Sequence, residues 1–144
     1  MRAEVIAIGD ELTTGQRLDT NTQWLSQRLT ELGVQVAFHT TITDELADNV
    51  AAFRAAIGRV DIVVATGGLG PTADDLTRDA IAAATNTELV RDEASLAHIK
   101  NLFASRGREM PVRNEVQADF PVGTLHRVFH RAHRVRRNSV GGGD

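Results

Sequence analysis

The chain has 144 residues with ordinary hydrophobic (42%) and charged (24%) contents, which suit one globular domain with a single core. Residues 1–125 carry 11 basic and 18 acidic side chains, a balance of −7 that excludes nucleic acid as a partner of this part, whereas residues 126–144 carry five arginines and one aspartate, a balance of +4. There is no cysteine, which excludes disulfides and thiolate metal sites. No stretch approaches the roughly 18 apolar residues of a membrane span, so we expect a cytoplasmic protein with no membrane partner.

Strands and helices are predicted to alternate along the chain. Residues 4–8 are a short apolar run ending at a glycine, which predicts a buried first strand. Residues 9–16 are predicted to form a loop. A helix is predicted over residues 21–32, with Gly33 as its left-handed stop. In residues 35–41 apolar and polar side chains alternate, which predicts a second strand.

The second half continues the alternation. Apolar residues at helical spacing predict a helix over residues 46–57. Residues 61–66 are the clearest strand, and their near-continuous apolar character predicts cover on both faces, as in parallel sheets. Further helices are predicted over about Thr77–Thr85 and after Asp92 as the capping residue. This order predicts an α/β fold with a parallel sheet wrapped by helices.

A glycine-rich turn follows the third predicted strand directly. Residues 67–72 read GGLGPT, and three glycines in four residues let backbone amides approach a ligand without interference from a Cβ atom. Turns between a strand's carboxyl end and a helix bind phosphates in α/β proteins. The alternative is that these glycines only make a tight turn. The stretch is neither a Walker loop nor the GxGxxG dinucleotide motif.

Two carboxylates, Asp74 and Asp75, follow this glycine-rich turn. They would repel an anionic ligand unless a divalent cation lay between them, and Mg²⁺ binds a few carboxylates together with phosphate oxygens. The alternative is a helix start, where the acids complement the helix dipole and Thr77 is the cap. We favour the metal interpretation.

Acidic residues also follow the other two predicted strands. Asp10 and Glu11 follow the first strand, with a polar loop as the alternative, and Asp44 follows the second, with a helix cap as the alternative. Because parallel strands bring their carboxyl ends to one edge, where open sheets bind ligands, we expect all these acids at the same edge.

Other catalytic chemistries lack their residues in this sequence. The five histidines show no zinc-binding spacing, no GxSxG motif occurs, and no thiol nucleophile is present. Water activated by a metal is the mechanism that is left. Trp24, the only tryptophan, is interpreted as a core or interface residue.

Several stretches match a known family. They read GDEL (residues 9–12), DTNT (19–22), TGGLGPTADDLT (66–77) and GREMP (107–111), with Asn114 and Gln117–Ala118 after them. Over about residues 1–125 the sequence resembles the N-terminal domain of the CinA (competence/damage-inducible protein A) family, a branch of the molybdopterin-binding (MoCF, MogA/MoeA-like) fold. Cofactor-synthesis members carry GGTG with arginine before the second aspartate, so Leu69 and Asp74 favour the CinA branch.

The resemblance implies a three-layer α/β/α fold with a mostly parallel sheet, and homo-oligomers. It implies one of two activities: hydrolysis of a nucleoside-diphosphate sugar such as ADP-ribose with Mg²⁺ or a similar divalent cation, or non-catalytic binding of molybdopterin or another pterin phosphate. An inactive fragment of a longer CinA-like protein is a third hypothesis. Functional acids of MogA-like relatives map onto Asp44 and Asp75.

The expected site residues fall into three groups. The catalytic residues are Asp75, Asp44 and Glu11, and the metal ligands are Asp75, Asp74 and Asp10. The ligand-binding residues lie at strand ends or in the matching motifs: Gly9, Asp10, Asn21, Thr66, Gly67, Gly68, Gly70, Thr72 and Thr77.

The resemblance stops near residue 125. Family members continue past residues 121–123 into an NPxGTAPG loop and further strands, whereas residues 126–144 are rich in arginine and histidine and lack apolar periodicity. We expect an irregular basic end produced by truncation or a frameshift. The alternative is a tail that binds an acidic partner. A missing strand would leave a sheet edge unpaired and part of the site open.

Overall fold

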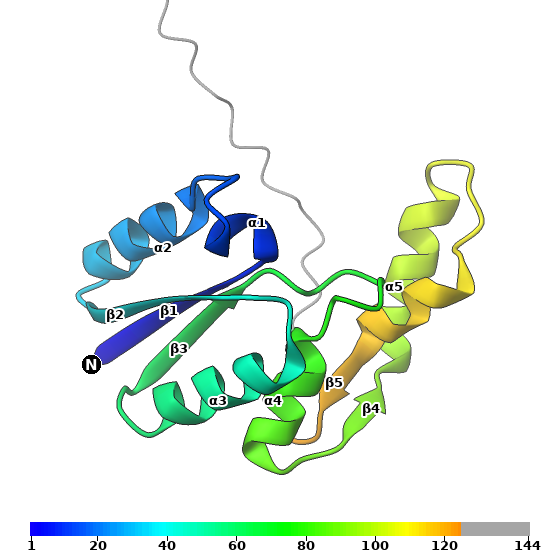
Figure 1. Ribbon diagram of the computed structural model, residues 1–144. Helices are drawn as coiled ribbons and strands as arrows, with labels where there is room; N and C mark the ends of the chain where they lie inside the picture. The colour runs from blue at the N-terminus through cyan, green and yellow to red at the C-terminus, as the bar shows by residue number, and fades with distance from the viewer. Residues whose placement is uncertain (125–144) are drawn as a thin grey trace, which may run out of the picture.

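A parallel three-stranded sheet lies at the centre of the molecule (Figure 1). The computed structural model describes residues 1–124, so the basic end expected over residues 126–144 lies outside the described residues. The strands are β1 (Arg2–Ile8), β2 (Gln35–Ile42) and β3 (Ile62–Thr66), in the order β2-β1-β3, and β1 is parallel to both neighbours. The predicted parallel sheet is therefore confirmed.

Helices cover both faces of this sheet. Helix α2 (Thr20–Glu31) lies on one face, and α3 (Leu46–Ile57) and α4 (Thr77–Thr85) lie on the other (Figure 1). The core on the α3 side is formed by five buried residues from β1, α3 and α4, which are Ile6, Ile8, Phe53, Ala56 and Ala80. Burying such apolar area is the main stabilising term of the fold. The three-layer α/β/α prediction is confirmed.

Local signals in the sequence explain where the helices begin and end. The Asp92 side chain accepts a hydrogen bond from the Ser95 N–H and caps α5 (Glu93–Ala104), as predicted. Gly33 has φ 77°, the left-handed geometry expected of a helix stop. One prediction is wrong: residues 10–13 form a short helix α1 (Asp10–Thr13) inside the predicted loop. Trp24, expected in the core or at an interface, is 52% exposed and so is not in the core, and its interface alternative stays a prediction.

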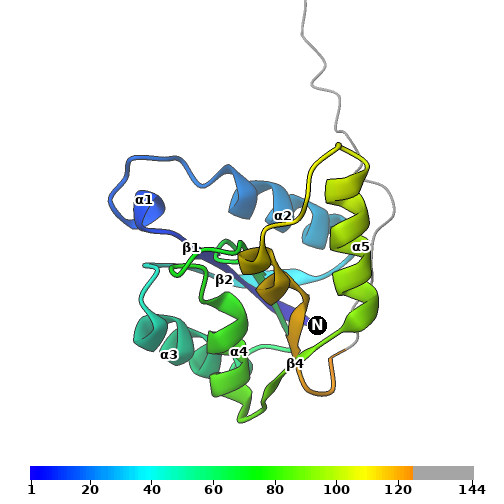
Figure 2. The same ribbon diagram turned by 90° about the vertical axis from the view of Figure 1, so that its right-hand side faces the viewer.

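A second, smaller unit follows α4, and only its helix α5 was predicted. Strands β4 (Leu89–Arg91) and β5 (Asp119–Pro121) pair in antiparallel fashion, with α5 and the 3-10 helix η1 (Val112–Ala118) between them (Figure 2). Each strand has three residues, too few to show the alternation by which strands are recognised in a sequence.

An ion pair lies at the start of the sheet, away from its carboxyl edge, between a buried Glu4 and an Arg59 side chain that is 40% exposed. The Glu4 side chain is fully buried and accepts hydrogen bonds from Arg59 Nε (2.8 Å), Arg59 Nη2 (2.6 Å) and the Thr40 hydroxyl (2.6 Å). The Arg59 guanidinium holds the pKa of Glu4 below its ordinary value, against the opposing effect of burial. This contact ties β1, β2 and the end of α3 together.

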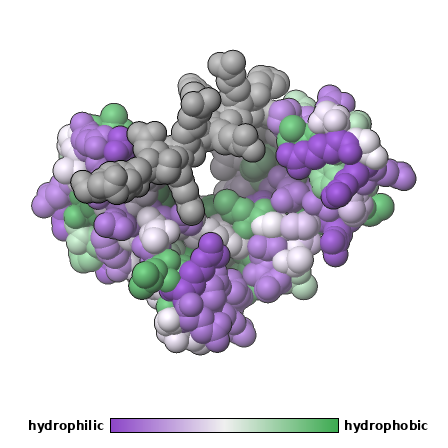
Figure 3. All heavy atoms as spheres, turned by 90° about the horizontal axis from the view of Figure 1, so that it is seen from above, coloured by the Kyte–Doolittle hydropathy of each residue, from purple (hydrophilic) through white to green (hydrophobic). Residues whose placement is uncertain are grey.

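Strand β3 was expected to be covered on both faces, but all five of its residues are only half-buried. Within residues 1–124 no strand pairs with its outer edge. An apolar cavity of about 380 Å³ lies beside it, and it shares Leu69 and Ile81 with a second apolar cavity of about 620 Å³ that extends toward α5 and β5. Figure 3 shows hydrophobic (green) side chains exposed near the middle of the face seen from above. No helix within the described residues has the length and hydrophobicity needed to cross a membrane.

Candidate functional site

The loops after β1 and β2 meet at the carboxyl edge of the sheet. The Asp10 N–H donates to Asp44 Oδ2 (3.1 Å), and the Asp44 N–H donates to Asp10 Oδ1 (3.0 Å). Asp44 therefore binds the start of α1 and does not cap α3, whose N-cap is Glu45 without a side-chain hydrogen bond. The predicted meeting of acids from two strands is confirmed, and each carboxylate keeps one oxygen without a partner within residues 1–124.

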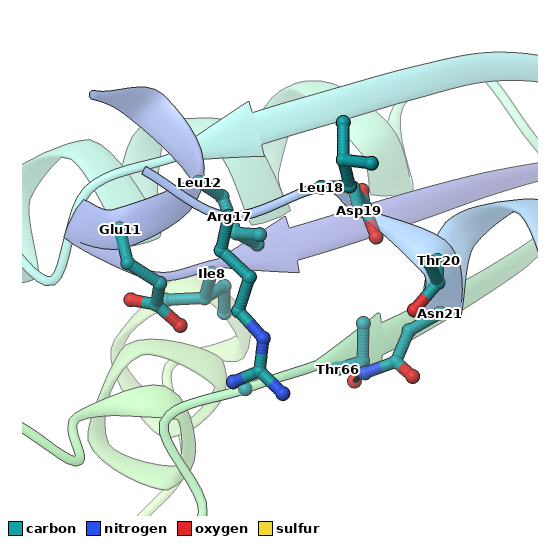
Figure 4. A pocket seen from close by; sticks show the side chains of 10 residues that line it. Ile8, Glu11, Leu12, Arg17, Leu18, Asp19, Thr20, Asn21 and Thr66 are labelled. Atoms are coloured by element: carbon teal, nitrogen blue, oxygen red, sulfur yellow. Dashed lines mark hydrogen bonds between the residues drawn. The ribbon is translucent and has the colours of Figure 1, made fainter. Parts of the chain in front are cut away.

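A polar pocket opens at the same edge, between the ends of β1 and β3 and the start of α2 (Figure 4). We call it the edge pocket. Its volume is about 210 Å³, and its lining residues come from four segments that meet here: Ile8, Glu11, Leu12, Arg17, Leu18, Asp19, Thr20, Asn21, Thr66 and Gly67. Four of the predicted site residues, Glu11, Asn21, Thr66 and Gly67, are thus brought together.

Some polar groups in the edge pocket already have hydrogen-bond partners within the protein. The Asp19 carboxylate accepts hydrogen bonds from the N–H and the hydroxyl of Thr22 and so caps α2. The Asn21 amide donates to the Thr66 hydroxyl (3.4 Å) and connects α2 to β3. The carboxylate of Glu11 folds back so closely on Gly9 that a Cβ there would lie 2.6 Å from Glu11 Oε2.

The three glycines of the GGLG turn are required by contacts within the protein. A Cβ at Gly67 would overlap the Ile8 carbonyl oxygen, one at Gly68 the Thr77 hydroxyl, and one at Gly70 the Asp75 carboxylate. The tight-turn interpretation therefore accounts for these glycines without a ligand. A valine at position 68 or 70 would disturb the turn itself.

The Asp75 carboxylate organises this turn. It accepts hydrogen bonds from the Thr72 N–H (2.9 Å), the Thr72 hydroxyl and the Gly70 N–H. Burial by itself would raise the pKa of Asp75, but these hydrogen bonds and the charge of Arg78 outweigh it and hold the pKa below its ordinary value. Asp75 and Thr72 line a different pocket from the edge pocket, beside Asp119.

Arg78 is a structural residue that sequence reasoning missed. It is 8% exposed, and its guanidinium donates to the carbonyl oxygens of Leu69 (2.7 Å) and Gly70 (2.7 Å). Thr77 is not the helix cap, because Leu76 occupies that position. The Thr77 hydroxyl donates instead to the Gly67 carbonyl (2.8 Å). Both side chains hold the glycine-rich turn against the start of α4.

Metal ligands were expected from Asp10, Asp74 and Asp75. Asp10 lies with Asp44, whereas the carboxylate of Asp75 is bonded within its own turn and Asp74 is exposed. Within residues 1–124 no three histidine, aspartate or glutamate side chains are grouped closely enough to hold a metal ion. A cation bound here would take further oxygens from a ligand or from water, as Mg²⁺ commonly does.

Sequence reasoning also missed six residues of the edge pocket: Ile8, Leu12, Arg17, Leu18, Asp19 and Thr20. Only Asp19 carries a local signal, since an aspartate three residues before a threonine is typical of a helix N-cap. Leu12 and Thr20 lie in the matching GDEL and DTNT stretches but were not assigned to the site, and Ile8 ends β1. Arg17 and Leu18 lie in the loop of residues 14–19, whose course tertiary contacts decide.

Comparison with known proteins agrees with this fold. Residues 4–140 match the family described as "Probable molybdopterin binding domain". A CinA-like protein from Anaeromyxobacter sp. is 46% identical over 123 residues, which cover 85% of this chain and 30% of that protein. The chain thus spans about a third of the length of such relatives.

Solved structures add the three-dimensional likeness. The protein CinA from Thermoplasma acidophilum, whose function is given as unknown, aligns with a TM-score of 0.78 and 34% identity over 85% of this chain and 71% of that one. The molybdopterin biosynthesis enzyme MoaB from Thermus thermophilus aligns with a TM-score of 0.55 and 22% identity over 78% of this chain and 68% of that one, which shows a shared fold.

The fold and the polar pocket at its sheet edge define a domain of the molybdopterin-binding class. Within that class, the chain belongs to the CinA family.

Proposed function

We propose that this chain binds a small phosphorylated ligand, ADP-ribose or a pterin phosphate such as molybdopterin, in the edge pocket. The observation that carries the proposal is the convergence of Arg17, Asn21 and Thr66 in a cavity at the carboxyl ends of two parallel strands. Open α/β sheets bind their ligands at this place. The family's description as a molybdopterin-binding domain supports the same class of ligand.

The size of the edge pocket limits which part of the ligand it holds. Its volume of about 210 Å³ is below the roughly 300–1,000 Å³ of pockets that enclose a drug-sized molecule. It suits a phosphate with the adjoining sugar or pterin-side hydroxyls. We expect the remainder of ADP-ribose or of the pterin to extend along the surface.

Metal-dependent hydrolysis of ADP-ribose to AMP and a sugar phosphate is the second candidate, favoured by the pairing of Asp10 and Asp44 beside Glu11. Each aspartate has one oxygen free of protein partners within residues 1–124, and such oxygens fit the donor preference of Mg²⁺. A divalent cation there would polarise the pyrophosphate and lower the pKa of a bound water. Glu11, which lines the pocket, would accept a proton from the attacking water.

Calorimetric titration with ADP-ribose, with and without Mg²⁺, tests both candidates, together with chromatographic measurement of AMP. We expect binding in both conditions and, for the second candidate, AMP only with Mg²⁺ present and none after chelation. Asn21→Leu should weaken binding about tenfold, because it removes the amide from the pocket and replaces it with an apolar side chain.

Asn101→Leu, on the exposed surface of α5, is the matched control and should bind as the parent does. Equal affinity in the two variants would contradict the assignment of the edge pocket. AMP release that chelation leaves unchanged would contradict the metal-dependent mechanism. Absence of any binding by the parent would support the hypothesis of an inactive fragment.

A further inference from the structure

We infer that Arg17 is the residue that binds the phosphate of the ligand and so gives the edge pocket its preference for anions. The inference rests on the proposed function, since it concerns the same pocket. Arg17 lies outside every motif that carries the family resemblance, so neither the glycine-rich turn nor the paired acids point to it.

The guanidinium of Arg17 has no protein partner within residues 1–124. Five of the ten arginines in residues 1–124 do have one: Arg28 pairs with Glu31, Arg54 with the Ala83 carbonyl, Arg59 with Glu4, Arg78 with two turn carbonyls, and Arg91 with Asp119 and Glu115. Arg17 does not form an ion pair with either acid of its pocket. Its charge is therefore available to a ligand.

The loop that carries Arg17 is held in place by its backbone. The Arg17 N–H donates to the Glu11 carbonyl (3.0 Å), and the Thr20 N–H donates to the Leu18 carbonyl (3.0 Å). In Figure 4 the Arg17 side chain reaches from this loop across the pocket, and its guanidinium lies between Glu11 and the Asn21–Thr66 pair. These backbone contacts fix the point from which the exposed Arg17 side chain extends.

One charged group in the pocket can attract an anion, although the two acids there outnumber it. Arg17 is the only basic residue among the ten that line it. Of the two acids, Asp19 accepts hydrogen bonds from the N–H and hydroxyl of Thr22, and Glu11 is folded against Gly9, so neither forms an ion pair with Arg17. The planar guanidinium donates paired hydrogen bonds that match two phosphate oxygens. The Asn21 amide and the Thr66 hydroxyl are neutral groups that can bind the hydroxyls next to such a phosphate.

Titration calorimetry of the full chain tests the inference, with ADP-ribose, inorganic pyrophosphate and adenosine as probes. Arg17→Gln should weaken ADP-ribose binding about ten- to hundredfold, because a charged hydrogen bond to the phosphate is lost. Arg17→Lys should recover part of the affinity, since lysine restores the positive charge but not the paired N–H donors of the guanidinium. Adenosine, which has no phosphate, should show no difference between the parent and Arg17→Gln. Arg108→Gln removes the same charge from the loop after α5 and should match the parent.

Equal ADP-ribose affinity in Arg17→Gln and Arg108→Gln would overturn the inference. If the parent binds pyrophosphate in an Arg17-dependent way but not ADP-ribose, the inference stands while ADP-ribose fails as the ligand. If the parent binds ADP-ribose with no dependence on Arg17, the proposed function stands and the inference fails.

Discussion

Replacing Asp75 with asparagine distinguishes a metal ligand from a residue that stabilises the turn. A metal ligand among crowded acids would be relieved of repulsion by this change, so the metal-free protein would become more stable. The structure indicates the opposite, because the carboxylate accepts three hydrogen bonds from Thr72 and Gly70 and lies near the charge of Arg78. Asparagine offers one acceptor oxygen and turns its NH₂ group toward another donor.

The expected loss can be estimated from these contacts. A hydrogen bond to a charged group contributes about 1.5–3 kcal/mol, and partial solvent exposure at this turn reduces that, so we expect Asp75→Asn to cost about 1–2 kcal/mol at neutral pH. The folded-state pKa of Asp75 is lowered, so its stabilisation is complete above the unfolded-state pKa of about 3.9 and is lost as the pH falls through the folded-state pKa. The difference between parent and variant should therefore shrink in acid.

Urea unfolding in the presence of a chelator, repeated from pH 7 toward pH 3, measures this difference. Asp74→Asn is the matched control, because the neighbouring carboxylate is exposed and has no partner within residues 1–124, and it should change stability by less than about 0.5 kcal/mol. An Asp75→Asn variant as stable as the parent, or more stable, would refute the reasoning.

Two further stability predictions follow from specific contacts. Gly70→Ala should lower the melting temperature by an amount equivalent to more than about 1 kcal/mol, because its Cβ would overlap the Asp75 carboxylate. Gly58→Ala is the control: its Cβ would make only ordinary contacts, at 3.6 Å, so it should be neutral or slightly stabilising. Similar losses in both variants would contradict the prediction. Glu4→Gln should cost about 2–3 kcal/mol of unfolding free energy at pH 7, and this cost should decline as the pH falls below the ordinary pKa of 4.5 and through the lowered folded-state pKa. Urea unfolding measures it, with Glu31→Gln at an exposed position as the control. Equal, pH-independent losses in the two variants would count against the Glu4–Arg59 pair.

The elements of the sheet and its cover could be predicted from the sequence because they are long enough to show a period. Strand β3 is a nearly continuous apolar run, and α3 repeats apolar residues at helical spacing. The unit formed by β4, η1 and β5 could not be predicted, since three-residue strands are defined by their partners and by contacts such as Arg91 with Asp119.

The candidate site could be predicted only in its location. Asp10 and Asp44 were expected at one edge because parallel strands place their carboxyl ends together, and they meet there. The roles of single residues depend on neighbours that are distant in space. The sequence shows three glycines, but it does not show that the Ile8 carbonyl or the Asp75 carboxylate fills the space a side chain would need. Likewise, nothing local reveals that the charge of Arg17 stays unpaired.

Amide chemical shifts during titration of the ¹⁵N-labelled chain with ADP-ribose test the central claim, ligand binding at the edge pocket, most directly. We expect saturable shifts at amides that line this pocket, above all Arg17, Asn21, Thr66 and Gly67, with little change around Asp75 or in α5. Shifts confined to the Asp75 turn or to the two apolar cavities, with the edge-pocket amides unmoved, would contradict the claim.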